Sequence, residues 1–223
     1  MLDANFSVII QQIAAYAIPF LFAITLHEVG HGWAAARLGD STARMLGRLT
    51  INPIKHIDPV GTIMMPAILL FVNSPFLFGW AKPVPVNPRK LWNPSRAMII
   101  VAAAGPTANF VMALFWAVML RLLVSFGEGL GSSADFFTEM IRFGINFNVL
   151  LGVFNLVPIP PLDGGRVLRE LGPPQLAGAL DRIEPYGFII VIVLAAFGPL
   201  WMVISPVMRF VTLGILSIVG FLG

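Results

Sequence analysis

The chain has 223 residues, of which 57% are hydrophobic and only 11% are charged. Soluble domains carry about 25% charged residues, so this composition excludes a globule with an ordinary polar surface. The net charge of +3 is small and gathers in loops, so nothing indicates a nucleic-acid partner, and the lack of cysteine excludes disulfides and thiolate metal sites.

Long uncharged stretches follow one another along the chain and predict a multi-pass membrane protein. Several of them reach the roughly 20 residues that a helix needs to cross the hydrocarbon core. The first stretch has no basic start and no cleavage site, so we expect a retained span and not a removable signal peptide. The last two predicted spans are either separate or one helix bent at Gly198-Pro199. The predicted helical spans are residues 7–38, 96–124, 136–157, 185–198 and 200–222.

Three basic loops orient these spans. Residues 37–60, 82–96 and 159–183 hold most of the Lys and Arg, whereas the N-terminus carries only Asp3. Basic loops beside spans usually mark the cytoplasmic face. We therefore place the three loops in the cytoplasm and the N-terminus outside.

The apolar residues 59–81 lie between two of these basic loops, so they either cross the membrane or enter and return on one side. Pro66 and the Asn-Ser-Pro break at 73–75 favour a re-entrant hairpin, which is tolerated where protein or a wet cavity surrounds it. The predicted fold class is an all-α polytopic membrane protein, a single domain over residues 1–223 with five to six membrane segments.

An H-E-x-x-H motif occupies residues 27–31 of the first span. On a helix, His27 and His31 share a face and can hold one zinc ion, Zn2+. Glu28 is then placed to take a proton from a water molecule that the zinc activates. The alternative is a set of polar residues packed between helices. Ionisable side chains within a span are costly and by default mark function, so we favour the zinc site.

A hydrolytic zinc site usually takes three protein ligands, and the candidates for the third are His56, Asp58 and Asp163. Asp163 is preferred because it ends an uncharged run, residues 143–162, long enough to return across the membrane. Prolines before Asp163 stop the helix, and Gly164-Gly165 after it leave room for a close approach. The alternative is that Asp163 caps a cytoplasmic helix. His56 and Asp58 are expected to organise their loop or to gate the water entrance.

Three motifs stand in a fixed order: H-E-V-G-H at 27–31, G-P-T-A-N at 105–109 and N-L-V-P-I-P-P-L-D-G at 155–164. Together they resemble the signature of the site-2 protease family of intramembrane zinc metalloproteases. The resemblance implies that Asp163 is the third zinc ligand.

The resemblance to this family also implies a three-helix core that holds the zinc near the cytoplasmic side of a prokaryotic cell membrane. The segment at 59–81 and the G-W-A-K-P-V-P-V-N run at 79–87 resemble a compact subgroup without PDZ or CBS domain. The core elements implied are residues 7–38, 96–124 and 136–165.

Asn109 and Asn155 are polar residues in otherwise apolar helices. Each either forms hydrogen bonds between helices or binds the substrate backbone or the developing oxyanion. Residues 45–51 are predicted to form a short membrane-associated β element, to whose edge an unwound substrate adds as a strand. The alternative for these residues is an ordinary basic loop.

The leading functional hypothesis is a zinc endopeptidase that hydrolyses membrane-protein or signal-peptide-like segments. Its partners are then a transmembrane protein or peptide substrate and the membrane lipids. One alternative is a non-hydrolytic membrane zinc protein, a transporter or scaffold, but such a protein needs no base like Glu28. Another is an unrelated zinc protease with the same pentapeptide, against which the downstream Leu162-Asp163-Gly164 argues.

Overall fold

The computed structural model describes residues 2–72, 79–131 and 133–221, and the regular elements among them are helical. The α-helices are α1 Leu2–Arg37, α2 Thr42–Met45, α3 Met65–Phe71, α4 Pro94–Phe126, α5 Ser133–Asn155, α6 Asp163–Leu171, α7 Pro174–Ala196 and α8 Pro199–Ile218. Short 3₁₀ helices occupy Pro53–His56, Pro88–Lys90 and Gly127–Leu130, and a π-helix occupies Pro59–Met64. These elements confirm the all-α prediction.

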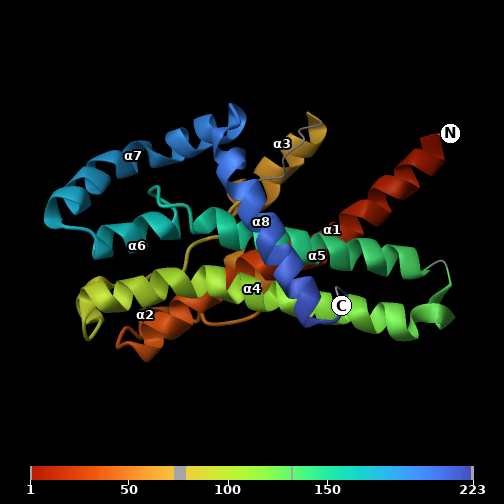
Figure 1. Cartoon of the computed structure of the whole chain (residues 1–223), viewed down its shortest axis with the longest axis horizontal. Helices are drawn as coiled ribbons and strands as arrows, with labels where there is room; N and C mark the ends of the chain where they lie inside the picture. Colours follow the sequence, from red (N-terminus) through yellow and green to blue (C-terminus); the bar gives the residue numbers. More distant parts are fainter. Residues whose placement is uncertain (1, 73–78, 132, 222–223) are drawn as a thin grey trace.

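The helices α1, α4 and α5 pack against one another in pairs and form the centre of the molecule. In Figure 1, α4 and α5 run side by side and α8 crosses both of them diagonally. Small residues allow the close approach of α1 and α4: a Cβ added to Gly30 would lie 2.7 Å from the carbonyl oxygen of Ala104. Such small contact residues are typical of helix packing in membranes.

Within the described residues, four helices are long and apolar enough to cross a membrane, fewer than the five to six segments predicted. They are Ile13–Arg37, Pro94–Phe126, Ser133–Asn155 and Pro199–Ile218. Many large apolar side chains on their outer faces are exposed, among them Val111 at 62% and Phe210 at 79%. Exposed apolar surface on this scale fits a lipid environment and not water.

The predicted span at 185–198 is not confirmed as a membrane segment. It is the second half of α7, whose first half carries charged residues such as Asp181 and Glu184. The apolar half, residues 185–196, is shorter than the roughly 20 residues that a spanning helix needs. Gly198, with φ of 95°, and Pro199 then separate α7 from α8, so two helices follow Glu184 and not one bent helix.

Residues 59–81 return to the point at which they begin. The N–H of Trp80 donates to the carbonyl oxygen of Gly61 at 3.1 Å, and the N–H of Lys82 donates to that of His56 at 2.8 Å. The apolar helical part, Pro59–Leu69, is too short to span a bilayer. Both features agree with a hairpin, and its re-entry into the membrane stays a prediction. The break at 73–75 lies outside the described residues.

The β element predicted at 45–51 is not confirmed. Met45 ends the short helix α2, and Gly47 turns the chain with φ of 65°. Residues 48–50 have no regular structure. A strand is defined by pairing with a neighbour, and within the described residues this segment has no strand beside it.

Candidate metal centre and active site

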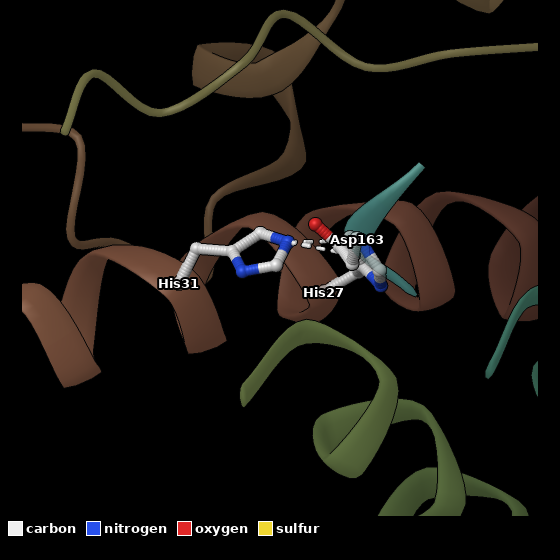
Figure 2. A group of neighbouring side chains, drawn as sticks. All are labelled: His27, His31 and Asp163. Carbon is white, nitrogen blue, oxygen red and sulfur yellow. Dashed lines mark hydrogen bonds and ion pairs between the residues drawn. The ribbon is translucent and has the colours of Figure 1, made fainter. Parts of the chain in front are cut away.

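Three side chains from two distant parts of the chain meet inside the bundle. His27 and His31 lie on α1, and Asp163 is the first residue of α6 (Figure 2). The Nε2 atoms of His27 and His31 lie 3.2 and 3.3 Å from Oδ2 of Asp163, and 3.1 Å from each other. Each residue is at most 7% exposed. The structure thus brings together the two histidines of the motif and the preferred candidate for the third ligand.

Hydrogen bonds on the far side of each ring determine where the protons lie. Nδ1 of His27 is 2.6 Å from Oδ1 of Asn109, and Nδ1 of His31 is 2.7 Å from the carbonyl oxygen of Val101. Both partners are acceptors, so each Nδ1 carries the hydrogen and each Nε2 presents a lone pair.

The point between the three side chains is therefore surrounded by electron-rich atoms only. Oδ2 of Asp163 is buried and accepts no hydrogen bond, and the Nε2 atoms of His27 and His31 lie 3.2 and 3.3 Å from it. Lone pairs held this close repel one another unless a cation lies among them. Two imidazole nitrogens and a carboxylate oxygen form an ordinary donor set for zinc, so these residues fit the expected metal.

Asn109 is part of a chain of amides that fixes the His27 ring. It is fully buried, and its Nδ2 donates to the carbonyl oxygen of Ala23 at 3.1 Å and to Oδ1 of Asn148 at 3.0 Å. Asn148 in turn donates to the carbonyl oxygen of Gly144 at 2.8 Å. These acceptors leave Oδ1 of Asn109 for His27. The structure thus shows the hydrogen bonds between helices that are one of the two interpretations of Asn109.

Gly105 on α4 leaves the space that the two imidazoles occupy. A Cβ at this position would lie 2.5 Å from Cε1 of His31 and 2.8 Å from Cε1 of His27, and closer still to Nε2 of His31. Real Cβ atoms do not approach other atoms so closely. The side of the site facing α4 is therefore shaped for the two rings, and any side chain at position 105 would displace them.

The loop between α5 and α6 folds back on itself and so brings Asp163 to the histidines. Cβ atoms on Gly164 and Gly165 would collide with backbone atoms of this loop, at 2.5 Å from the oxygen of Val157 and from the nitrogen of Pro160. The two glycines allow this close approach because they have no side chain. Both residues were expected to have this role.

Glu28 lies beside the histidines and is held by the segment that follows the hairpin. We call residues 82–93, which join the hairpin to α4, the connector. The N–H of Val84 in the connector donates to Oε2 of Glu28 at 2.7 Å. The connector is itself anchored by the side chain of Asp40, which accepts from the N–H of Asn87, and by Arg48, which donates to the carbonyl oxygen of Lys82 at 2.8 Å. One oxygen of Glu28 is thus fixed, and within the described residues the other accepts no hydrogen bond.

Asn155, the last residue of α5, is partly exposed where the site opens. Its Nδ2 donates to the carbonyl oxygen of Leu151 at 2.9 Å, which leaves the second N–H of this amide for another partner. Unlike Asn109, it lines a cavity of about 390 Å³ together with Glu28 and Asp163.

The other two candidate ligands lie outside the group of three. Burial lowers the pKa of His56 below its ordinary value, and the neutral ring bonds through Nε2 to the carbonyl oxygen of Thr50 at 3.0 Å. Oδ1 of Asp58 accepts from the N–H groups of Val60 and Gly61 at 3.0 and 2.8 Å. Both side chains organise the loop before the hairpin, one of the two roles expected of them.

Sequence reasoning missed three residues near the site: Asn148, Val84 and Arg166. Asn148 carried a usable signal, because it is a polar residue in an apolar helix, as Asn109 and Asn155 are. Val84 acts through its backbone N–H, which has no signature in the sequence.

A membrane metalloprotease combines apolar helices, a metal-binding group and a carboxylate beside it. This chain has all three, with His27, His31 and Asp163 as the group and Glu28 as the carboxylate. Residues 15–194 match the profile described as Peptidase family M50, so the chain belongs to this family. The membership confirms the resemblance to the site-2 proteases.

Two relatives share much of the chain. The chain is 40% identical over 178 residues to "Putative zinc metalloprotease YwhC" of Bacillus subtilis (strain 168), an alignment that covers 79% of this chain and 78% of that protein. It is 33% identical over 175 residues to "Putative zinc metalloprotease Rip2" of Mycolicibacterium smegmatis, covering 78% of this chain and 64% of the relative. A more distant relative, "Zinc metalloprotease MJ0392" of Methanocaldococcus jannaschii, is 23% identical over 71% of this chain and 34% of its own length. No solved structure matches the chain.

Proposed function

We propose that this protein is an intramembrane zinc endopeptidase that hydrolyses peptide bonds in membrane-protein or signal-peptide-like segments. The observation that carries the proposal is the convergence of two imidazole lone pairs and a buried carboxylate oxygen on one point, with Glu28 beside it. His27, His31 and Asp163 are the proposed ligands. The names of the relatives above support zinc as the metal.

When bound there, zinc supplies a Lewis acid that lowers the pKa of a water molecule to about 7. Glu28 is the proposed general base: its free oxygen accepts the proton of the attacking water, and the same carboxyl then gives a proton to the leaving amine. The hydrogen bond from Val84 keeps the carboxylate facing the cavity during both steps. Asn155 is proposed to donate its second N–H to the substrate carbonyl as negative charge develops there.

The site is proposed to lie near the cytoplasmic side of a prokaryotic cell membrane. His31 stands six residues before Arg37, which ends α1, and this corresponds to about 9 Å along the helix axis. The adjoining loops carry the basic residues that favour the cytoplasm. A substrate segment in the bilayer reaches this depth without leaving the membrane.

The test is cleavage of a single-span substrate by the purified protein in liposomes. Native protein should produce two fragments whose ends, read by mass spectrometry, lie within or beside the apolar segment. A zinc chelator should stop the reaction, and added zinc should restore it. A transporter or scaffold would produce no fragments under any of these conditions.

A further inference from the structure

Two cavities of different character meet at the site. The cavity of about 390 Å³ contains the three proposed ligands, whereas a second cavity of about 810 Å³ extends away from them between the helices. His27, Glu28, Asn155 and Pro161 line both cavities. A peptide bond held beside Glu28 therefore has one cavity on each side of it.

The larger cavity is lined by apolar side chains from the hairpin, which includes α3, and from the helices α1, α5, α7 and α8. Among the described residues that line it, Glu28 is the one charged residue, at the end where the cavity joins the site. Representative wall residues are Ile24 of α1, Leu69 of α3, Phe154 of α5 and Ile192 of α7. Its volume is within the range of pockets that enclose a whole small-molecule ligand, so it has room for bulky apolar side chains.

The smaller cavity has a cation at its edge. Arg166 of α6 is the one Lys or Arg among its lining residues, and its side chain is half exposed. Within the described part of the chain, its guanidinium makes an ion pair with Oδ1 of Asp163 at 3.9 Å, which is too far for a hydrogen bond. The five N–H donors of Arg166 are thus available at the mouth of the site.

Charge balance makes this cavity attractive to anions. The carboxylates of Glu28 and Asp163 carry two negative charges, which a divalent metal ion would offset when bound. The guanidinium of Arg166 then leaves a positive charge that favours an acidic side chain and repels a basic one.

We propose that the site selects a junction in its substrate, with bulky apolar residues on one side of the scissile bond and an acidic residue on the other. The apolar side chains enter the larger cavity, and the acidic side chain pairs with Arg166. This inference rests on the proposed peptidase function and adds its substrate class. The cytoplasmic flanks of most spans are rich in Lys and Arg. A site with Arg166 at its mouth spares those spans and cleaves the ones with an acidic flank.

The charge half of the proposal is tested with single-span substrates that differ only in the residue next to the apolar stretch, which is Asp, Ala or Lys. Native protein should cleave the Asp substrate with kcat/KM about tenfold above that of the Lys substrate. Arg166→Glu should reverse this order while zinc content stays the same. Arg182→Glu, a charge reversal on the exposed face of α7, is the matched control and should keep the native order. Equal rates for the Asp and Lys substrates with native protein, or an unchanged order in Arg166→Glu, overturn the proposal.

The apolar half is tested by narrowing the larger cavity with Leu69→Trp. Leu69 is partly exposed on α3 and lines only this cavity, so the core helices stay intact. The variant should shift the preference beside the scissile bond from Phe to Ala, and an unchanged preference contradicts the assignment.

Binding separates a failure of this inference from a failure of the proposed function. Fluorescent peptides with Asp or Lys flanks are titrated into Glu28→Gln and into Glu28→Gln combined with Arg166→Glu. Glu28→Gln should bind the Asp peptide more tightly, and the double variant should bind the Lys peptide more tightly. This result supports the proposed junction even if no cleavage is found. Equal binding of both peptides by both proteins overturns it even if the native protein cleaves.

Discussion

Oδ1 of Asn109 lies 2.6 Å from Nδ1 of His27, and this contact joins α4 to α1 directly behind the proposed metal site. The amide fixes the ring with its Nε2 lone pair toward Asp163. Hydrogen-bond partners of this kind typically contribute 10–100-fold to metal affinity. Asn109→Ala should therefore lower the zinc affinity by about 10–100-fold, measured by competition with a chelator of known affinity.

Two further variants serve as controls for Asn109→Ala. Thr107→Ala removes an exposed hydroxyl on the same helix, bonded only to the carbonyl oxygen of Ala103, and should leave zinc affinity unchanged. Asn148→Ala acts one step further from the ring and should have a smaller effect than Asn109→Ala. Native zinc affinity in Asn109→Ala would show that the ring is oriented by something else.

A second prediction concerns Gly105, because a Cβ there occupies the space of both imidazoles. Gly105→Ala should lose most of its bound zinc and its activity. Alanine is the better helix former by about 1 kcal/mol, so a loss of helix propensity does not account for this result. Gly214→Ala on α8, where nothing lies within 4 Å of the added Cβ, is the matched control. The zinc content of both variants is measured by mass spectrometry. A full zinc content in Gly105→Ala would contradict the packing of Gly105 against the two imidazoles.

A third prediction isolates the hydrogen bond from Val84 to Glu28. Val84→Pro removes this N–H, whereas Val84→Ala keeps it and removes only the side chain. Hydrogen bonds to charged groups contribute about 1.5–3 kcal/mol, which corresponds to a fall in kcat of roughly 10–100-fold. We expect that fall for Val84→Pro relative to Val84→Ala, with zinc content equal in both. Equal kcat values for the two variants would show that the connector does not position Glu28.

The sequence predicts the core helices and the three converging side chains because their signals are local. Uncharged runs mark α1, α4 and α5, and prolines and glycines around Asp163 mark a tight turn that brings the chain back. The predicted span at 185–198 begins later than α7, because the helix also contains charged residues such as Asp181, which a search for uncharged runs excludes. The strand at 45–51 was expected from composition, but strand formation also requires a partner.

The roles of Val84 and Arg166 could not be predicted from the sequence, because each depends on a contact between distant elements. Val84 meets Glu28 only after the hairpin returns to its starting point. Arg166 reaches the site only because α6 begins at Asp163. Local patterns do not contain such distances.

A fourth prediction is that residues 59–81 re-enter the membrane with both ends in the cytoplasm. The chain has no cysteine, so single cysteines at Lys55 and Arg89, both exposed, can be labelled without background. An impermeant reagent should label both from the same side in oriented vesicles. A cysteine at Ser133, the exposed first residue of α5, should be labelled from the opposite side. Labelling of Lys55 and Arg89 from opposite sides would make the segment a full span.

The most direct test of the catalytic account is Glu28→Gln, with zinc content and cleavage of a single-span substrate measured on one preparation. The amide has nearly the shape of the carboxyl group and can still accept the hydrogen bond from Val84, so the variant should keep its fold and its zinc. An amide cannot accept the proton of water, and general acid–base catalysis typically contributes about 10²–10⁴-fold. We therefore predict native zinc content with a rate lower by about 10⁴-fold or more. Native zinc content together with a near-native rate would contradict the assignment of Glu28 as the base.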